Sequence, residues 1–434
     1  DPATLHNLKK ARMANGTYSE LDEKWPVAEP KTGMAADILE YLLRKRTDAF
    51  FWFLRHYKPN LVLGKGGPVF VTRYRDVKEI LDNPEVFQVT YRPMMDPSVG
   101  PFMLGRDGTV YNERDKGLMR SLIQQRDLPE VRKVVAQLSA ECIEDGFSDG
   151  QIEIVSRLTR KAPILLNGKY FGFPGPDLPT MMKWSRDTQA DMFHNTKMVG
   201  KVHDDDIRAG RFMRHYLKSE LLPQRRRELK KNPDLDDVVS RLLKLKTPEE
   251  IGFTEERMLS NIMGMLVGHI ETTSAAIVQA LDQLLRRPGA LAGAKAAAEA
   301  GDDRLLYRYC WEALRFNPVN PIVLRLCVED YRVASGAWRN TLIKGGSVVL
   351  VATRSAMKDE REVEKPRKFR LDRPDHHYMH LGYGMHRCLG DHVSQVQVPE
   401  IMKSLILKPN LRRVTEIDYA DGPFPERFVV TFDA

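Results

Sequence analysis

The chain has 434 residues, of which 67 are Lys or Arg and 59 are Asp or Glu, giving a net charge of +8. Its length suits one large domain or two to three ordinary ones, because single cores rarely grow beyond about 250–300 residues. Four cysteines without a C-x-x-C pair argue against a disulfide framework or a zinc site and favour a reducing compartment. No window approaches the ~18 consecutive apolar residues of a membrane span, and a signal-peptide pattern is missing. We therefore expect a soluble, cytoplasmic protein.

The basic excess is moderate, and its distribution argues against a nucleic-acid partner. Apart from Arg225–Arg227 and Lys230–Lys231, basic residues are interspersed with Asp and Glu, and no basic strip is interleaved with aromatic residues. A run of this kind is most often a solvated helix face. The excess is better matched by an acidic protein partner. Because the chain begins at Asp1 without Met, trimming or processing is a further expectation.

The N-terminal part changes its pattern twice. Residues 1–45 mix proline, glycine and charges, and we expect them to wrap the surface and to include a helix from Met34. Residues 61–72 then predict a β-hairpin with a Gly-Lys-Gly-Gly turn, and Asp76–Asp82 a short helix. Residues 60–90 are therefore expected to form a β-rich subregion.

Residues 91–105 follow neither a helical nor a strand period. They combine methionines and aromatic residues with three prolines, which argue against any regular element. Such an apolar segment would be a liability if it were exposed, so we expect it to be covered. It is either a loop that contacts a ligand or a buried loop that uses adaptable methionine as filler.

The middle of the chain, residues 129–250, is mostly helical in pattern. It is broken at the glycine- and proline-rich residues 172–176 and at Asn232-Pro233. No constellation of residues with an evident chemistry occurs there.

One long helix is predicted over residues 254–287, with Thr254 as its cap and Pro288 as its stop. A helix of this length is roughly 50 Å long. It is apolar nearly all round in its middle, which predicts a buried central helix. Glu271 lies within it, and a buried carboxylate requires a reason.

A further helix is predicted from Tyr309 and ends before Asn317-Pro318. Within it, Glu312 and Arg315 are three residues apart and can form an ion pair on one face. On an exposed surface such a pair would carry no information.

The segment Leu381-Gly-Tyr-Gly-Met-His-Arg-Cys-Leu-Gly390 places Cys388 among three glycines. All three are free to take positive φ, so the backbone can approach a flat object closely. A helix is predicted to follow from Asp391, and a thiolate at a helix start is stabilised by amide donors and the macrodipole. Cys388 therefore suits a metal ligand, although a free cysteine in a turn is the simpler interpretation of that residue alone.

The spacing Gly-x-Gly-x-His-x-Cys-x-Gly resembles the haem-binding loop of the cytochrome P450 superfamily. The resemblance implies that Cys388 is the thiolate ligand of the iron of haem b. It also implies that His386 contacts a haem propionate and that Gly382 belongs to the cofactor site. Leu381 departs from the pattern, because the family usually has a phenylalanine there that helps to shield the thiolate.

The same resemblance covers residues 60–434. It implies a mainly α fold with a small β region, a helical prism around haem, as one domain over residues 1–434. The loop at residues 381–390 would hold the cofactor from one side and the helix at residues 254–287 would lie on the distal side.

The predicted central helix resembles the family motif Ala/Gly-Gly-x-Asp/Glu-Thr. By this resemblance Thr272 donates a hydrogen bond beside dioxygen, Glu271 relays protons, and Gly268 leaves room above the iron. His269 stands where a second small residue is usual. We expect it to be a satisfied core histidine; the alternative is that it changes proton delivery or narrows the oxygen groove.

Further haem contacts are implied by position along the chain. The family has a His-x-x-x-Arg pair that binds propionates, and here Lys116 and Arg120 take its place on one helix face. Arg120 is the better match, because the guanidinium suits carboxylates. Arg325 aligns with another propionate-binding arginine, and Val323 would face the pocket.

Glu312 and Arg315 match the structural Glu-x-x-Arg pair of the family, which locks the segment beneath the haem and is needed to retain it. Its third member is expected within Phe369–Arg373. Residues 91–105 match the family loop over the distal pocket. The residues thereby implied to contact substrate are Met94, Met95, Val99, Phe102, Met103 and Arg92, the last as an anchor for an acid group.

The reaction implied is insertion of one oxygen atom from O2 into a C–H or C=C bond of a small apolar organic substrate. The chain has no flavin or iron–sulfur motif, so electrons from NAD(P)H must arrive through a separate ferredoxin or flavodoxin and its reductase. A basic face with Arg387, Arg120 and Arg126 would suit such an acidic partner. Two alternatives stay open: a peroxide-dependent or hydroperoxide-rearranging haem-thiolate enzyme, which usually lacks the acid–alcohol pair, and a haem-based gas sensor.

Overall fold

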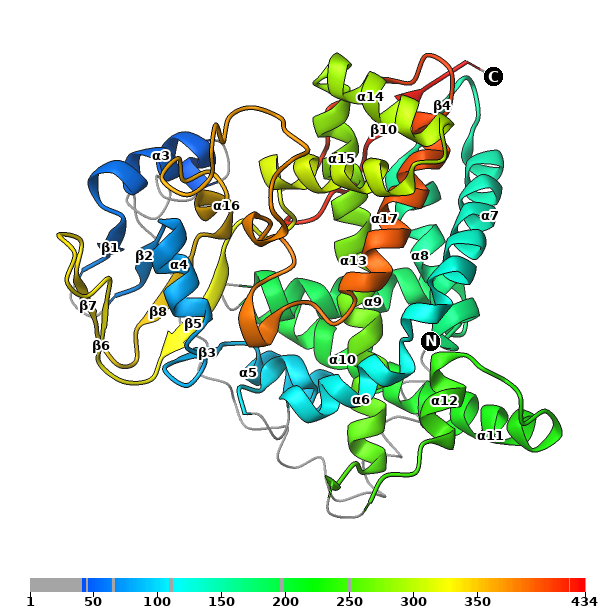
Figure 1. Cartoon of the computed structure of the whole chain (residues 1–434). Helices are drawn as coiled ribbons and strands as arrows, with labels where there is room; N and C mark the ends of the chain where they lie inside the picture. The colour runs from blue at the N-terminus through cyan, green and yellow to red at the C-terminus, as the bar shows by residue number, and fades with distance from the viewer. Residues whose placement is uncertain are drawn as a thin grey trace.

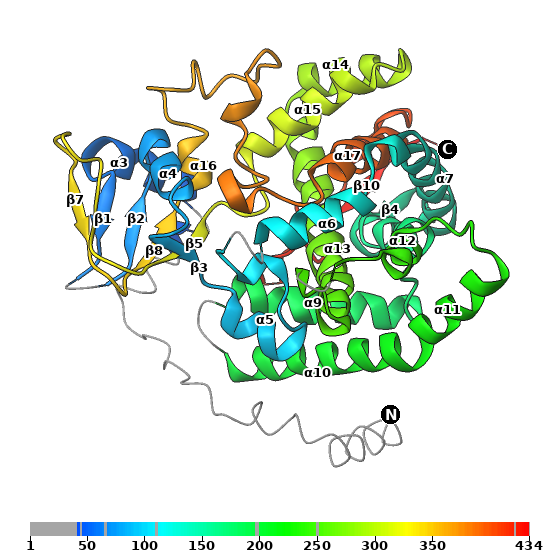
Figure 2. The ribbon, with the colours of Figure 1, turned by 60° about the horizontal axis from the view of Figure 1, so that its bottom comes forward.

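The computed structural model describes residues 41–43, 46–64, 67–108, 112–195, 199–248, 251–420 and 422–433. The expected N-terminal wrap and the helix from Met34 lie almost wholly outside the described residues. Figures 1 and 2 show two regions side by side: a smaller one built around a sheet, and a larger helical one arranged around α13 (Glu255–Leu285). This mainly α architecture with a small β region is the predicted fold class.

The remaining helices and strands have the following bounds. The helices are α3 (Thr47–Tyr57), α4 (Tyr74–Leu81), α5 (Arg92–Ser98), α6 (Arg114–Leu122), α7 (Leu128–Gly146), α8 (Lys161–Leu166), α9 (Leu178–His194), α10 (Gly200–Tyr216), α11 (Leu222–Lys231), α12 (Val238–Lys244), α14 (Pro288–Glu299), α15 (Asp303–Phe316), α16 (Thr353–Ala356) and α17 (Asp391–Ile406). The strands are β1 (Asn60–Val62), β2 (Val69–Val71), β3 (Phe87–Val89), β4 (Gln151–Glu153), β5 (Val323–Cys327), β6 (Tyr331–Val333), β7 (Thr341–Ile343), β8 (Val348–Val351), β9 (Arg412–Arg413) and β10 (Val429–Thr431). Within the described part of the chain, no helix combines the length and the apolar character needed to cross a membrane.

The main sheet has the strand order β1-β2-β8-β5-β3. β1 and β2 pair antiparallel with Leu61 opposite Phe70, which confirms the predicted hairpin. β2 then pairs in parallel with β8, where Phe70 lies opposite Leu350. β5 pairs antiparallel with both β8 and β3. Strands from the first hundred residues and from the last hundred and twenty thus share one sheet, and α3, α4 and α16 lie beside it (Figure 1).

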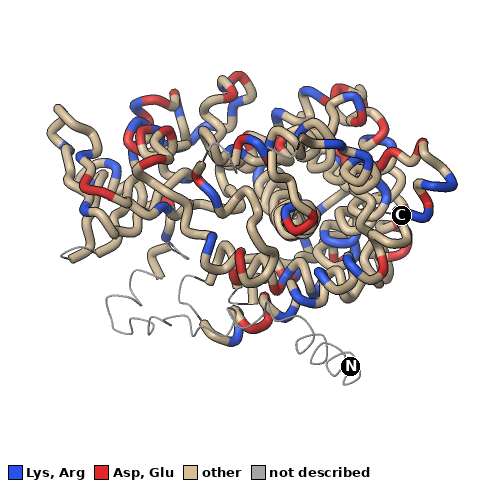
Figure 3. Tube along the Cα trace, turned by 90° about the horizontal axis from the view of Figure 1, so that it is seen from below, with Lys and Arg blue, Asp and Glu red and all other residues tan. Residues whose placement is uncertain are grey.

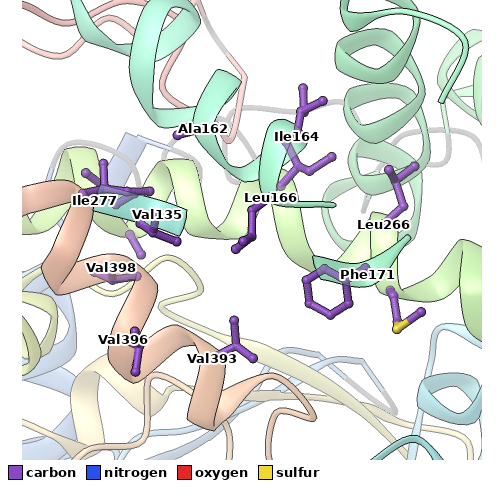
Figure 4. Close-up of a cluster of buried hydrophobic side chains, with 14 of the residues drawn as sticks. Val135, Ala162, Ile164, Leu166, Phe171, Leu266, Ile277, Val393, Val396 and Val398 are labelled. Carbon is purple, nitrogen blue, oxygen red and sulfur yellow. The ribbon is translucent and has the colours of Figure 1, made fainter. Parts of the chain in front are cut away.

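The core of the helical region is built on α13, as the apolar pattern predicts. Thr254 caps the helix, because its Oγ1 accepts a hydrogen bond from the Arg257 amide at 3.3 Å. Side chains of α7, α8, α13 and α17 meet in one cluster (Figure 4). Each side chain of this kind stabilises the fold by about 1.5–3 kcal/mol when it is fully buried. Those labelled in Figure 4 include Val135, Ile164, Leu166, Leu266, Ile277 and Val396.

Residues 92–98 form the helix α5, so the prediction of no regular element in this segment was wrong. Pro93 lies in the first turn, where an amide has no partner within the helix and a fixed φ is already helical. Pro97 follows only one turn later, so its missing amide removes a single internal hydrogen bond. The expectation that the segment is covered is confirmed, since Met95 and Val99 are fully buried.

A buried ion-pair network holds the segment that follows β8 against α15. Glu312 receives two hydrogen bonds of 2.8 Å from Arg315, and both side chains are 0 % exposed. Arg373 donates to the same carboxylate at 3.1 and 3.2 Å, and it is the third member that was expected in this stretch. Arg315 also donates to the carbonyls of Met357 and Pro366. The network therefore ties residues 357–373 to one helix.

We predict that Glu312→Ala destabilises the protein strongly, because it leaves Arg315 and Arg373 buried without a counter-charge. The expected loss is about 3–5 kcal/mol of unfolding free energy. The matched control is Glu130→Ala, which removes an exposed Glu–Lys pair with the same spacing on α7 and is expected to cost less than about 0.5 kcal/mol. Thermal unfolding of the holoprotein distinguishes the two. Equal losses in both variants would contradict this account of the network.

Candidate active site

The loop around Cys388 is closed by a hydrogen bond from the Cys388 amide to the Leu381 carbonyl at 2.9 Å. Gly382 and Gly384 have φ of +79° and +63°, the left-handed region that glycine adopts freely. A side chain at Gly384 would also place its Cβ 2.8 Å from the Leu81 carbonyl of α4. Gly390 has φ of −85°, so the third glycine does not use the positive φ that the sequence pattern allows.

Cys388 is half-buried and lies three residues before the start of α17. Burial raises the pKa of its thiol, while the Gly390 amide, Lys116 and Arg387 oppose that rise. The stabilisation expected from the helix start is thus outweighed by desolvation. Left to the protein alone, the thiol form is favoured, and a ligated cation would supply the charge that holds a thiolate.

Lys116 supports the cysteine loop from α6. Its Nζ donates to the carbonyl of Met385 at 2.6 Å and to that of Arg387. Burial lowers the pKa of Lys116 to about 8. Arg120, one turn later, is exposed. The structure therefore shows a loop-supporting contact for Lys116, and propionate binding by either residue stays a prediction.

His386 and Arg325 lie at the same edge of the loop together with an acid that sequence reasoning missed. The Nε2 of His386 is 2.8 Å from Asp107 Oδ1, and burial lowers the pKa of this histidine in spite of that contact. Burial therefore favours the neutral form of the His386 ring. Arg325 is 5 % exposed, and burial lowers the pKa of its guanidinium while Tyr91 and Asp107 raise it. Asp107 had no distinguishing signal in the sequence.

One face of α13 has small side chains near the middle of the helix. Gly268 is exposed although Val267 beside it is buried and His269 is half-buried, and a Cβ there would meet nothing within 4 Å. Thr272, one turn later on the same face, is half-buried, and its hydroxyl donates to the Gly268 carbonyl at 2.6 Å. One turn earlier, Gly264 lets the ring of Phe102 lie directly against the helix, since a Cβ there would overlap that ring. Phe102 and the open face of α13 are thus neighbours.

Glu271 is buried and fully paired, by partners that the sequence did not reveal. Its carboxylate lies 2.7 Å from Arg160 Nη2 and 2.9 Å from Arg186 Nη2. Ser185 donates its hydroxyl to the same carboxylate at 2.8 Å. Arg186 and Ser185 come from α9, and Arg160 immediately precedes α8, so the acid is held by elements far apart in sequence. This contact set explains why a charge is tolerated within the core.

His269 points to α17 and satisfies one nitrogen there. Its Nε2 is 2.8 Å from Gln397 Oε1, and its ring lies 5.1 Å from that of Phe171. Burial lowers the pKa of His269 to about 4, so the ring is neutral near pH 7. These contacts agree only in part with the expectation of a satisfied core histidine, because His269 Nδ1 is buried without a hydrogen-bond partner among the described residues.

The residues expected to contact substrate occupy different environments. Met95, Val99, Phe102 and Met103 are buried, Met94 packs at the edge of the same core, and Val323 is half-buried at the start of β5. The Arg92 side chain is 69 % exposed, and its Nε donates to Asp96 Oδ2 at 3.3 Å. That surface pair does not favour the predicted anchor for an acid group. The roles of all six residues and of Arg92 stay predictions.

Comparison with known proteins gives the family. The family model described as Cytochrome P450 matches residues 177–412. The chain belongs to the cytochrome P450 family. It is similar to the cyclomarin C epoxidase CymV of Salinispora arenicola, with 26% identity over 81% of this chain and 86% of that protein. It is also similar to the mycinamicin IV hydroxylase/epoxidase of Micromonospora griseorubida, with 22% identity over 81% and 85% of the two chains.

The fold of this chain is also similar to the folds of solved structures. A solved cytochrome P450 structure from Chondromyces apiculatus superposes with a TM-score of 0.73 at 22% identity, covering 91% of this chain and 96% of that one. The protein is therefore a P450 oxidoreductase of the monooxygenase type, with a haem cofactor and O2 as co-substrate. The residues present fit haem: Cys388 offers a thiol, Arg325 and Lys116 offer cations, and the uncovered Gly268 leaves room beside α13.

We predict that Lys116→Met speeds loss of haem, because the carbonyls of Met385 and Arg387 lose their donor beside the ligand loop. An unsatisfied buried carbonyl costs about 1–3 kcal/mol, which corresponds to roughly a 5- to 150-fold faster loss. Transfer of haem to apomyoglobin measures the rate. Lys133→Met on the exposed face of α7 is the control and should leave it unchanged. Identical rates in both variants would contradict a supporting role for Lys116.

Proposed function

We propose that this P450 oxidises an apolar organic molecule held between the residue 91–105 segment and the open face of α13, with Cys388 as the iron ligand. The observation that carries the proposal is the pairing of Gly268 and Thr272 in the middle of a helix that is mostly buried, with Phe102 lying against Gly264 beside them. A core helix exposes such a face only where something other than protein covers it. The names of the two curated relatives, an epoxidase and a hydroxylase/epoxidase, support C=C or C–H oxidation.

Haem bound through Cys388 supplies the reductive activation of dioxygen. The protein then has to place substrate and deliver protons. Thr272 holds its hydroxyl on the open face by donating to the Gly268 carbonyl, so the oxygen lone pairs remain able to accept and the hydroxyl can turn to donate. Glu271 is the acid next to Thr272 in the sequence. Its carboxylate reaches the open face of α13 only by leaving Arg160 or Arg186. We infer that these two arginines set how readily protons pass through Glu271.

Electrons from NAD(P)H would enter through a separate acidic ferredoxin or flavodoxin and its reductase at the face formed by Arg120, Arg126 and Arg387. Arg120 and Arg126 are exposed, and Arg387 is 40 % exposed beside Asp391. A surface pocket of about 480 Å³ opens next to Arg387 and Leu381. Its lining includes the further basic side chains Arg132, Arg304, Arg308 and His392 as well as the acidic Asp303 and Asp375, and Arg132 pairs with Asp303. This concentration of cations beside the ligand loop supports an acidic partner, although Lys and Arg alternate with Asp and Glu elsewhere (Figure 3).

The proton-delivery role predicts that Thr272→Ala keeps haem and substrate binding but wastes electrons. Without the hydroxyl, product formed per NAD(P)H is expected to fall by about tenfold or more, with a matching rise in hydrogen peroxide, since general acid catalysis contributes about 10²–10⁴-fold. Thr272→Ser should restore coupling. Unchanged coupling in Thr272→Ala would contradict the assignment, and faster turnover with added peroxide than with reductant would favour a peroxygenase instead.

The partner face predicts that Arg126→Glu slows reduction of the haem by a ferredoxin. The expected decrease is about 3- to 10-fold at low ionic strength and should shrink as salt screens the surface charges. Arg227→Glu makes the same change of net charge on the exposed side of α11 and serves as the control. Stopped-flow reduction with a common donor compares them. Equal rates for the two variants would place the electron entry elsewhere.

A further inference from the structure

Three side chains able to ligate a metal meet where α9, α10 and α5 pack against one another (Figure 2). They are Asp191 of α9 and His203 and Asp206 of α10, and one ligand atom of each lies within 4.8 Å of the other two. Asp191 and Asp206 are 1 % and 0 % exposed. His203 is half-buried, so the cluster has one edge that solvent reaches.

Each carboxylate has one oxygen that is held by a neutral donor and one that is not. Asp191 Oδ1 accepts from the Asn195 amide at 2.6 Å, while its Oδ2 lies 2.7 Å from His203 Nδ1. Asp206 Oδ1 accepts from the Ser98 hydroxyl at the end of α5, while its Oδ2 is buried without any hydrogen-bond partner. Two carboxylate oxygens and one imidazole nitrogen therefore face one another: Asp191 Oδ2 and His203 Nδ1 share a hydrogen bond, and Asp206 Oδ2 has no hydrogen-bond partner.

The pairing of charge in this cluster rests on His203, which forms an ion pair with Asp191 when its ring is protonated. Among the described residues, neither Asp191 nor Asp206 forms an ion pair with a lysine or arginine, in contrast to the buried Glu271 and Glu312. Two buried carboxylates in contact require either a shared proton or a cation between them.

We propose that Asp191, His203 and Asp206 bind one divalent transition-metal ion of the Zn²⁺ type. One imidazole and two carboxylates form a three-ligand set that suits zinc, with a fourth position for water on the exposed side of His203. Asn195 and Ser98 hold the non-ligating oxygens and so orient both carboxylates, as outer-shell groups do at metal sites. The ion neutralises both charges and satisfies the unpartnered Asp206 oxygen.

The site would fasten α9 to α10 and, through Ser98, to the end of α5. The residues that follow Ser98 lead to Phe102, which lies against α13. Metal binding would therefore stiffen the cover over the open face of α13. The proposal does not depend on the oxidation chemistry, because metal binding is measured without turnover.

The test is calorimetric titration of Zn²⁺ into chelator-treated holoprotein, with Mg²⁺ in parallel. We expect one Zn²⁺ per chain and no comparable binding of Mg²⁺, since an imidazole favours zinc. Asp206→Asn and His203→Gln should each weaken binding by more than about 100-fold, because loss of an outer-shell group alone costs about 10–100-fold. His376→Gln, at an exposed histidine beside the half-buried His377, is the matched control and should leave binding unchanged.

Two further readouts separate the possible results. Crystals soaked in Zn²⁺ should give an anomalous peak between α9 and α10, and amide exchange in the first turns of α10 should slow with Zn²⁺ but not with Mg²⁺. Equal Zn²⁺ affinity in the wild type and in Asp206→Asn would show that Zn²⁺ binds only at the surface. That result would overturn the proposal. No Zn²⁺ binding by the wild type, together with a more stable Asp206→Asn protein, would overturn it in favour of a proton shared by the two carboxyls.

Discussion

The structure depends on burying α13 on almost every side while leaving a short stretch of one face uncovered. A helix of 31 residues in the core has to be apolar nearly all round, so each polar or small residue within it is informative. Gly264 and Gly268 remove bulk on successive turns, which brings Phe102 in at one position and leaves the next one open. The same burial obliges Glu271 to find counter-charges in other elements.

Buried charges in this protein are mostly neutralised by arginines from distant segments, and these pairs determine how the segments are joined. Glu271 connects α13 to α9, and Glu312 connects α15 to Arg373. Asp115 of α6 pairs with Arg257 in the first turn of α13. Since removal of one partner leaves a charge without solvent, these pairs make the arrangement of the helices specific. Asp206 does not follow this pattern, so its chemical environment differs from that of the other buried acids.

Local patterns were enough to predict the long elements and the motifs. The central helix agrees with residues 254–287 to within two residues, and the hairpin and α4 are where turn chemistry indicated. α5 was missed because the cost of proline depends on its position within a helix, and Pro93 occupies a turn in which it is tolerated.

Most residues of the candidate site could be predicted from motif spacing, but the contacts that these residues make could not. Nothing near Glu271 in sequence indicates Arg160 or Arg186, which reach it only after α8 and α9 have packed. Lys116 matched a cofactor contact by position, whereas the structure shows it donating to loop carbonyls. Arg92 lies in an apolar stretch, yet a helical turn brings Asp96 within its reach. Long-range packing decides each of these cases.

The order of strands in the main sheet has a consequence for how the chain reaches its native state. β2 obtains its second neighbour only from β8, so Phe70 has no strand on that side until Leu350 has been synthesised. Contacts between residues so far apart in the sequence form slowly, and strand edges that are still unpaired promote aggregation. A nascent chain leaving the ribosome thus carries β1 and β2 as an open-edged hairpin through the synthesis of the whole helical region.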